Sequence, residues 1–422
     1  MAAYVRRMHH VSLHVSNVDK LAKDFTSKFK FNLIASRLTE RTRQLAFRTG
    51  AAVFVVNERT NQSGEPEPQH LPLDGHQIGG CLYDIPSHYP VDTVCNVCFE
   101  VDDVNGSFEA LRRLGCSFPV PPTTVRDHEG QVTYAVLRST VGNVCHTLID
   151  KSEYRGSFLP GFQVPDGGPE QPQHCQEAVT HMDHITYACP TGTSQQILRW
   201  YQQLFGFQRF FIHRNDMADS GLVIDQNGIG LRLAAMEYWK CGESGLSLPG
   251  THQKEADCKF VLAESLPEQG SNQVNTFLKE HRAAGIQHIG LYTGDIVAAV
   301  RGMADAGVHF FSPPAAYYSE VEKLQEIEDA GQDAQQLARL GILLDSNQQQ
   351  QNSSAGETHR YLLQVFSKPI FAEDTFFLEL IQRKGASGFG EGNIRALWKS
   401  VQVYMDGEKA EEAPEAALQQ SR

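Results

Sequence analysis

Strand-like alternation of apolar and polar residues opens the chain at residues 8–15, Met-His-His-Val-Ser-Leu-His-Val. Two helical patterns follow, one over residues 18–29 and one over residues 104–114 that ends before Gly115, a residue type that favours helix C-termini. Residues 61–90 are rich in proline, glycine and polar residues and predict a long loop. The strand patterns of this half lie at residues 8–15, 44–47, 52–56, 93–101, 131–137 and 144–149.

The second half of the chain repeats this order. Residues 182–187, Met-Asp-His-Ile-Thr-Tyr, begin like the first strand, and a later helical pattern ends at Gly307 as the earlier one ends at Gly115. A repeat of roughly 180 residues is too long for a solenoid and indicates duplicated domains. Because each half interleaves strands and helices, we expect an α+β fold with mostly antiparallel or mixed sheets.

The repeat also predicts the domain organisation. We expect an N-terminal domain over residues 1–151, a linker rich in glycine and proline over residues 152–178 and a C-terminal domain over residues 179–406. Residues 393–405 carry apolar side chains at helical spacing and predict a helix with one packed face. Residues 407–422 are rich in glutamate and alanine, which predicts a disordered tail.

Composition narrows the functional classes. The formal net charge of −13, without any cluster of basic and aromatic residues, argues against a nucleic acid or an anionic membrane as partner. No apolar run approaches the about 20 residues that span a bilayer. Nine cysteines without a framework spacing indicate a reduced, intracellular protein.

Arg6 and Arg7 loosely suit mitochondrial import, but the first strand leaves almost no room for a cleavable presequence, so a cytoplasmic location stays open.

Three residues of the second half predict a metal site. Glu379 lies in the middle of residues 376–383, an apolar stretch typical of a buried strand, where an unpaired carboxylate would be costly. His184 and His288 also lie in the middle of strand patterns. If the three strands belong to one sheet, two imidazoles and one carboxylate meet on one face and leave open positions suited to ferrous iron with a substrate and O₂. The alternative is that both histidines are hydrogen-bonded core residues and Glu379 pairs with an arginine.

The first half serves as an internal control for this site. Aligning the halves places His10, Asn96 and Thr147 opposite the three predicted ligands, so only one possible ligand of three is kept. We therefore expect the second half to be the active domain and the first half to be a degenerate, structural one. Cys95 and Cys98 have CxxC spacing, but strand alternation predicts that they face opposite sides, which argues against zinc.

Several stretches of the second half resemble the 4-hydroxyphenylpyruvate dioxygenase family of the vicinal-oxygen-chelate superfamily. The matches run in order through most of residues 180–400 and include Met-Asp-His-Ile at 182–185, Ile-Gln-His-Ile at 286–289, Phe-Leu-Glu-Leu-Ile-Gln-Arg at 377–383 and Gly-Phe-Gly-Glu-Gly-Asn at 388–393. The resemblance implies tandem βαβββ modules that form two open barrels. It also implies one Fe(II) per chain, held by His184, His288 and Glu379, and a helix over residues 393–405 that closes the site.

The resemblance carries substrate-contacting roles to individual positions. It implies that Gln287 and Gln364 lie near the substrate and the iron, and that the remaining pocket positions are Ser220, Gln273, Phe366, Phe377, Phe389 and Asn393. Each phenylalanine could equally be plain core, and Gln273 could be a surface residue. The implied substrates are 4-hydroxyphenylpyruvate, a 2-oxo acid, and O₂.

Two departures from the family pattern bear on the product. Residues 233–235 are Leu-Ala-Ala where the dioxygenases have Pro-Ile-Asn, and Ile394 follows Asn393 where they have phenylalanine. In having isoleucine at that position, the chain resembles the hydroxymandelate synthases of the same family. We therefore expect 4-hydroxymandelate as the product, with homogentisate as the alternative and a catalytically silent binding or scaffold protein as the alternative of another class. The resemblance also implies a mitochondrial protein linked to ubiquinone head-group synthesis, and a homo-oligomer is compatible with it.

Overall fold

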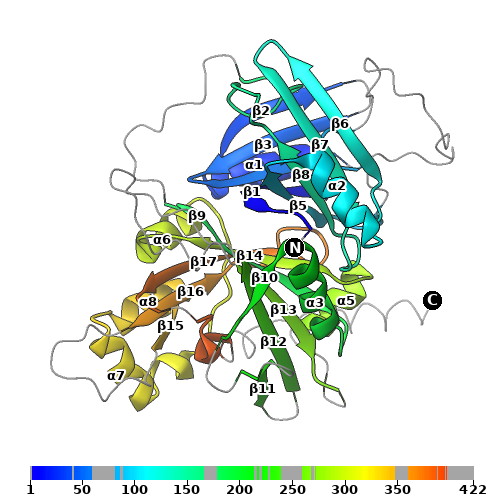
Figure 1. The fold of residues 1–422 in the computed structure, drawn as a ribbon. Coiled ribbons are helices and arrows are strands. Elements are labelled where there is room, and N and C mark those ends of the chain that lie inside the picture. Colours follow the sequence, from blue (N-terminus) through cyan, green and yellow to red (C-terminus); the bar gives the residue numbers. More distant parts are fainter. Residues whose placement is uncertain are drawn as a thin grey trace, which may run out of the picture.

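The computed structural model describes residues 2–39, 42–58, 81–85, 89–165, 178–212, 216–217, 221–226, 229–238, 259–267, 270, 272–346, 360–386, 388–394 and 396. These residues form two curled sheets with helices on their outer sides, so the expected α+β class is confirmed (Figure 1). No helix among them is both long and apolar enough to cross a membrane.

The first sheet contains eight strands in the order β2-β3-β4-β1-β5-β8-β7-β6. Helix α1 (Val18–Lys23) continues into a π-helical turn (Asp24–Lys28), and α2 (Val104–Arg113) begins at the capping side chain of Asp103. The strands are β1 (Val5–Val15), β2 (Asn32–Leu38), β3 (Arg43–Thr49), β4 (Ala52–Glu58), β5 (Thr93–Val101), β6 (Val120–Asp127), β7 (Gly130–Arg138) and β8 (Cys145–Asp150).

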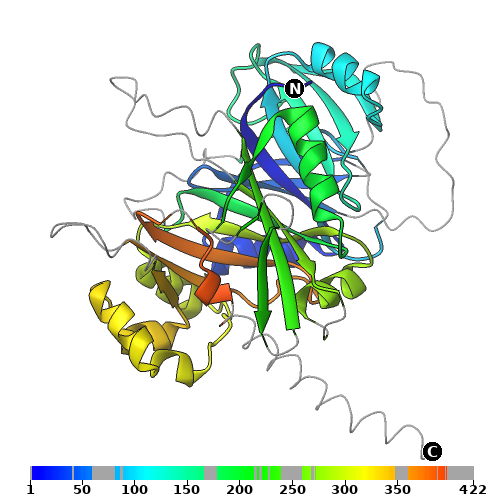
Figure 2. The ribbon, with the colours of Figure 1, turned by 60° about the horizontal axis from the view of Figure 1, so that its bottom comes forward.

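The second sheet has the order β10-β12-β13-β9-β14-β17-β16-β15, with β11 paired to β12. Its strands are β9 (His181–Cys189), β10 (Phe207–Phe210), β11 (Leu222–Gln226), β12 (Ile229–Tyr238), β13 (Lys259–Ser265), β14 (Gly285–Tyr292), β15 (Leu343–Ser346), β16 (Tyr361–Phe366) and β17 (Phe377–Lys384). Its helices are α3 (Ser194–Phe205), α5 (Gln273–His281), α6 (Ile296–Asp305), α7 (Val321–Asp329), α8 (Ala334–Leu340) and a 3₁₀ turn (Ala315–Tyr318). Helices α7 and α8 gather near β15 at one edge (Figures 1 and 2).

The duplication extends to the strand directions. In the first sheet β1 runs parallel to β4 and antiparallel to β5, and β5 runs parallel to β8. In the second sheet β9 runs parallel to β13 and antiparallel to β14, and β14 runs parallel to β17. The two sheets fall on either side of the predicted linker at residues 152–178, and the domain boundaries themselves remain a prediction.

Three expectations from the sequence are refined. Strands β2 and β6 were not expected, and both lie at an edge of the first sheet, where prolines such as Pro121 are tolerated. Part of the expected loop at residues 61–90 is not exposed, because Leu82, Tyr83 and Asp84 are buried. Of the expected helix at residues 393–405, residues 393, 394 and 396 are helical, and the rest, like the expected tail, lies outside the described residues.

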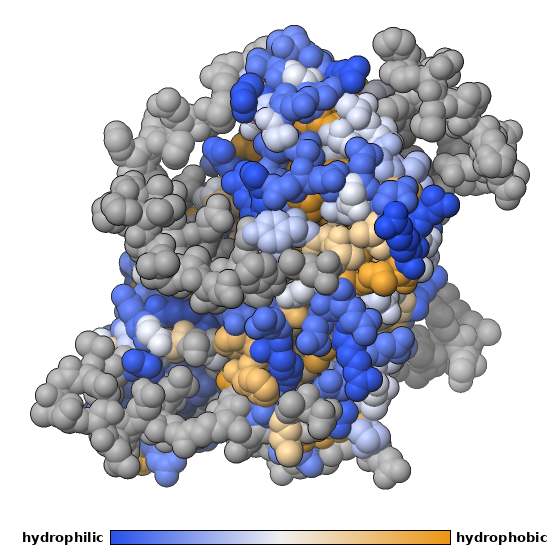
Figure 3. All heavy atoms as spheres, in the orientation of Figure 1, coloured by the Kyte–Doolittle hydropathy of each residue, from blue (hydrophilic) through white to orange (hydrophobic). Residues whose placement is uncertain are grey.

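A continuous apolar core joins the two halves. Phe99 of β5 packs against Phe205, Phe207 and Phe260 of the second half, and strands β5 and β14 lie side by side where the halves meet. Polar side chains predominate on the surface seen in Figure 3, with apolar ones in small patches between them. The strands therefore bury most of their apolar side chains between and within the sheets.

A histidine crosses the contact between the halves. His146 of β8 donates from Nδ1 to the Val97 carbonyl at 3.1 Å and accepts at Nε2 from the Tyr201 hydroxyl at 2.8 Å. Burial lowers the pKa of His146 to about 4, although the hydrogen bond to Val97 acts in the opposite direction. Below pH 6.5 the unfolded chain therefore binds a proton that the folded chain does not. The stability contribution of neutral His146 is complete above pH 6.5 and is lost as the pH falls towards 4.

Replacing this histidine should change how the stability depends on pH. We expect His146→Phe to lower the free energy of unfolding at pH 7.5 by about 1–3 kcal/mol, because two buried hydrogen bonds are lost. The double variant His146→Phe/Tyr201→Phe removes both partners and should recover part of that loss. In both variants, thermal melts should show a smaller decrease in Tm between pH 7.5 and 5 than in the wild type. A decrease equal to that of the wild type would contradict the role given to His146.

Candidate metal centre

The three predicted metal ligands come from three neighbouring strands of the second sheet. His184 lies on β9, His288 on the adjacent β14 and Glu379 on β17 at its other side. The strand register pairs Gly290 with both His184 and Glu379, so these three residues form a row across the sheet. His288 lies two residues before Gly290 and therefore shares its face. The structure thus brings together all three residues from separate parts of the chain.

Their side chains converge to metal-binding distances. Oε2 of Glu379 lies 3.2 Å from Nε2 of His184 and 3.6 Å from Nε2 of His288. The two imidazole rings are perpendicular, with centroids 5.5 Å apart. Bonds of about 2.1 Å from adjacent ligands to one ion would separate the donor atoms by about 3 Å. These three atoms can therefore bind a single divalent cation.

The electrostatics of the cluster also fit a cation. Glu379 and His184 are almost completely buried, at 1% and 2% exposure. Burial alone would lower the pKa of His184, but the carboxylates of Glu379 and Asp183 outweigh it and raise the pKa to about 9. For His288, burial and the neighbouring His184 both lower the pKa. The buried carboxylate of Glu379 thus faces two imidazoles, of which only that of His184 readily holds a proton. A divalent cation bound between them would interact favourably with the carboxylate and with both rings.

A buried ion pair orients His184. Asp183 Oδ1 lies 2.9 Å from His184 Nδ1, and Arg383 donates from Nε and Nη2 to the two oxygens of Asp183 at 2.7 and 2.8 Å. Burial would raise the pKa of Asp183, but the hydrogen bonds from Arg383 and His184 lower it strongly. An ionised Asp183 accepts the Nδ1 proton, so replacement of the Nε2 proton by a cation would leave the Nε2 lone pair directed towards the metal position.

A glycine makes room for the His184 ring. A Cβ added at Gly290 would overlap Cε1, Nδ1 and Nε2 of His184. In the first sheet the corresponding row is His10, Cys98 and Thr147, with Asn96 in the position of His288. The register therefore agrees with the alignment of the halves made from the sequence. Cys98 has a side chain at the position that corresponds to Gly290. The two halves therefore differ in the room left for an imidazole ring as well as in the candidate ligand residues.

A chain of hydrogen bonds connects Glu379 to the C-terminal segment. Gln364 of β16 donates from Nε2 to Glu379 Oε1 at 2.8 Å and accepts at Oε1 from Asn393 Nδ2 at 2.9 Å. Tyr317 in turn donates to Asn393 Oδ1 at 3.0 Å. The predicted site residues Gln364 and Asn393 therefore position the carboxylate and fix the start of the C-terminal helix.

Aromatic and aliphatic side chains form the walls of the centre. Phe377 stacks on the His288 ring at 4.7 Å, and Phe389 meets the His184 ring edge-on at 5.1 Å. Phe366 packs against Phe377. Ile394 packs on the cluster that contains Phe389, Leu233 and Ala235. The two departures from the family pattern, at residues 233–235 and at Ile394, therefore lie in the same wall.

The remaining predicted residues differ in their relation to the centre. The Oε1 atom of buried Gln287 lies 3.4 Å from Nδ1 of His288 and can accept its proton. Gln273 is the first residue of α5, and among the described residues no hydrogen bond joins it to the three ligands. Ser220 lies outside the described residues. No sequence pattern predicted a role for Asp183, Arg383, Tyr317 or Gly290, although Arg383 lies four residues after Glu379 and thus on the same face of β17.

Substituting Gly290 by alanine should abolish metal binding while the fold is kept. The added methyl group would displace the His184 ring, and we expect Fe(II) uptake, measured by metal analysis after anaerobic loading, to be lost. Gly302→Ala is the matched control, because a Cβ there meets open space in the middle of α6. The control should bind metal normally and gain up to about 1 kcal/mol of stability. Normal uptake by Gly290→Ala would contradict the assigned position of His184.

Neutralising Asp183 should weaken the centre without removing a ligand. We expect Asp183→Asn to reduce metal affinity about 10- to 100-fold, which is the usual effect of losing the partner of a ligating histidine. Isothermal titration with Fe(II) or Co(II) measures the affinity. Asp102→Asn at an exposed ion pair is the control and should leave it unchanged. An unchanged affinity in Asp183→Asn would show that Asp183 does not orient His184.

Comparison with known proteins identifies the family of the chain. The sequence model of the Glyoxalase/Bleomycin resistance protein/Dioxygenase superfamily matches residues 181–330. The 4-hydroxyphenylpyruvate dioxygenase-like protein of Mus musculus is 42% identical over 409 residues, which cover 95% of this chain and 98% of that protein. The 4-hydroxyphenylpyruvate dioxygenase of Neurospora crassa is 28% identical over 93% of this chain and 90% of its own length.

A solved structure has the same fold. A triple mutant of 4-hydroxymandelate synthase from Streptomyces coelicolor superimposes with a TM-score of 0.70 at 22% identity, covering 95% of this chain and 99% of that one. The two open, curled sheets therefore have the vicinal-oxygen-chelate fold expected from the sequence. Together, these similarities over nearly the whole length show that the chain belongs to the 4-hydroxyphenylpyruvate dioxygenase family of non-haem iron dioxygenases.

Proposed function

We propose that this protein oxidises 4-hydroxyphenylpyruvate with O₂ at a single Fe(II) held by His184, His288 and Glu379, and that it releases 4-hydroxymandelate and CO₂. The atoms balance, because one oxygen atom of O₂ enters the carboxylate formed on loss of CO₂ and the other becomes the new hydroxyl group. Bound Fe(II) would supply the site at which the 2-oxo acid is chelated and O₂ is activated. The meeting of these three side chains at 3.2 and 3.6 Å supports the iron-dependent reaction most directly.

The surrounding residues would prepare the site for this reaction. Asp183 and Gln287 can each accept an Nδ1 proton, from His184 and His288 respectively, so that both Nε2 lone pairs remain available. Gln364 holds one oxygen of Glu379 and leaves Oε2 towards the histidines. Phe377 and Phe389 exclude water from the two imidazoles. The residues thus fix the ligands and the walls before the substrate arrives.

The choice of product rests on the wall near Ile394. Homogentisate requires the aromatic ring to meet the oxidant, whereas 4-hydroxymandelate requires the benzylic CH₂ group to do so. Ile394, Phe389, Leu233 and Ala235 belong to one apolar cluster, so this wall differs in shape from one with phenylalanine at position 394. A shift of about 1 Å in the position of a substrate can redirect such a reaction.

Homogentisate formation is the second candidate. It is favoured by relatives named 4-hydroxyphenylpyruvate dioxygenase, such as that of Xenopus tropicalis, which is 28% identical over 94% of this chain. A binding or scaffold protein without catalysis is the third candidate, and the complete ligand set opposes it. The mitochondrial location, the link to ubiquinone head-group synthesis and a homo-oligomer are further proposals that rest on the resemblance alone.

A product assay separates these candidates. Purified protein is loaded anaerobically with Fe(II), mixed with 4-hydroxyphenylpyruvate and air, and the product is identified by NMR, because homogentisate and 4-hydroxymandelate are isomers. Hydroxymandelate is the expected result. Homogentisate would retain the iron site and overturn the proposed product, and the absence of both products from iron-loaded protein would overturn the proposed substrate.

A substitution at Ile394 tests the role of the wall. We expect Ile394→Phe to move the product ratio towards homogentisate, because the larger side chain narrows the space beside Phe389. Val321→Phe adds the same aromatic ring at an exposed position of α7 and should leave the ratio unchanged. If both variants give the wild-type ratio, selectivity does not depend on this wall.

A further inference from the structure

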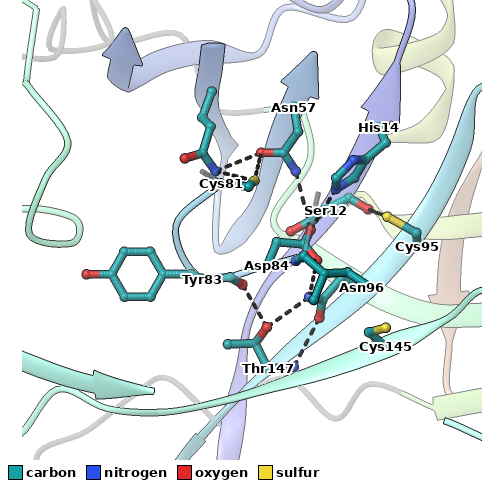
Figure 4. A network of polar contacts seen from close by, with 12 residues as sticks. Ser12, His14, Asn57, Cys81, Tyr83, Asp84, Cys95, Asn96, Cys145 and Thr147 are labelled. Atoms are coloured by element: carbon teal, nitrogen blue, oxygen red, sulfur yellow. Dashed lines mark hydrogen bonds and ion pairs between the residues drawn. The ribbon is translucent and has the colours of Figure 1, made fainter. Parts of the chain in front are cut away.

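The first sheet encloses a second cluster of potential metal ligands, separate from the iron centre. It consists of His14 from β1, Asp84 from the segment at residues 81–85 and Cys95 from β5, and all three are buried. The nitrogen, oxygen and sulfur atoms that they offer lie within 4.8 Å of one another. Figure 4 shows the three side chains directed towards a common region, with Ser12 beside them.

A bulge turns Cys95 towards this region. Between β1 and β5 the register moves from Ser12 opposite Asn96 to Leu13 opposite Val94, which leaves Cys95 as the extra residue. Val94 and Val97 belong to the core between the halves, whereas Cys95 does not. The expectation that Cys95 and Cys98 face opposite sides is therefore wrong, because the bulge shifts the alternation. They nevertheless belong to different clusters, since Cys98 lies with His9 and His10.

Several contacts fix Asp84 inside the sheet. The preceding Tyr83 has a left-handed backbone, with φ of +61°, which a bulky residue rarely adopts. Oδ1 of Asp84 accepts hydrogen bonds from Asn96 Nδ2 at 2.7 Å and from the Ile85 backbone at 2.8 Å. Gln44 holds Leu82 through both its backbone groups. Oδ2 of Asp84 faces Nε2 of His14 at 3.0 Å. Oδ2 also accepts a hydrogen bond from Asn57 Nδ2 at 3.3 Å, so Asn57 and Asn96 hold the two carboxylate oxygens beside His14.

We propose that His14, Asp84 and Cys95 bind a structural zinc ion in the first half of the protein. Imidazole, carboxylate and thiolate are all zinc ligands, and the separation of 3.0 Å between His14 and Asp84 suits two neighbouring ligands of one ion. The charges of Zn²⁺, one carboxylate and one thiolate sum to zero, so the buried site carries no net charge. This inference is independent of the proposed function.

Proton transfers accompany the binding. Without metal, burial raises the pKa of the Cys95 thiol, so the thiol is protonated and can donate to the Ser12 carbonyl at 3.8 Å, and Nε2 of His14 can donate to Asp84. Zinc replaces the thiol proton, which leaves to solvent, and the imidazole proton moves to Nδ1. Nδ1 of His14 has no hydrogen-bond partner among the described residues.

Ser12 offers a fourth ligand. It lies two residues before His14 on β1 and therefore on the same face of the strand. Its hydroxyl oxygen is buried, and among the described residues it has no hydrogen-bond partner. A structural zinc site has four ligands, and this unpaired hydroxyl, or a water that it holds, would complete the set.

Cobalt(II) substitution of the full-length protein tests the proposal, because a thiolate bound to Co(II) absorbs strongly in the near ultraviolet and the iron centre contains no thiolate. We expect the reduced wild-type protein to bind two equivalents of Co(II) and to show this absorption. Cys95→Ser should lose the absorption and one equivalent. Glu379→Ala should lose the other equivalent and keep the absorption. Zinc added in excess should remove the absorption from wild type.

Two further variants make the result unambiguous. Cys98→Ser changes a buried thiol three residues away on the same strand and should keep the absorption. Asp84→Asn should weaken Co(II) binding at the thiolate site more than tenfold, with thermal melts confirming that each variant is folded. Absence of the absorption in folded wild-type protein, or its persistence in Cys95→Ser, would overturn the zinc site and leave a hydrogen-bonded network in its place. Loss of the iron centre alone would leave the proposal intact.

Discussion

A buried carboxylate in the middle of a strand is the constraint on which the second half of the protein depends. Glu379 is 1% exposed, and a carboxylate in such surroundings requires opposite charge and hydrogen bonds. Two imidazoles face one of its oxygens, and the amide of Gln364 satisfies the other. The row of His184, Gly290 and Glu379 exists because β14 lies between β9 and β17 in the sheet. The strand order is therefore what makes a metal centre available to the chain.

The two sheets share one strand arrangement but enclose different sets of buried polar side chains. Both have the same central strand order, and the bulge at Cys95 in β5 has a counterpart at Gln287 in β14. In the second half, Gly290 leaves space for an imidazole ring, whereas the first half has Cys98 at that position. In the first half, Asn96 donates to Thr147 at 2.8 Å and to Asp84, so the residues that correspond to His288 and Glu379 are bonded to each other (Figure 4). Small differences in side-chain volume thus accompany the difference between a candidate metal centre and a hydrogen-bonded network.

Strand alternation explains how much could be predicted from the sequence. The class and the duplication follow from apolar patterns, which are local properties. The convergence of His184, His288 and Glu379 was predicted on the condition that their strands share a sheet and from the family resemblance. The edge strands β2 and β6 were missed because an edge strand needs no regular apolar face. The orientation of Cys95 and the burial of Asp84 depend on a bulge and on a segment that folds back into the sheet. Both are set by pairing with distant residues, and no local pattern encodes them.

The apolar wall beside the three candidate ligands is also assembled from residues that lie far apart in the sequence. The ligands and their supports are fixed by adjacent strands, and Arg383 links them to the C-terminal segment by donating to the carbonyl of Gly388, next to Phe389. The wall beside them is assembled from β12, which carries Leu233 and Ala235, and from residues 389–394. Asn393 bonds to Gln364 and thereby ties this wall to Glu379. Two separate sets of hydrogen bonds therefore hold this wall in a fixed position relative to His184 and Glu379, while Ile394 itself contributes to the wall by apolar packing.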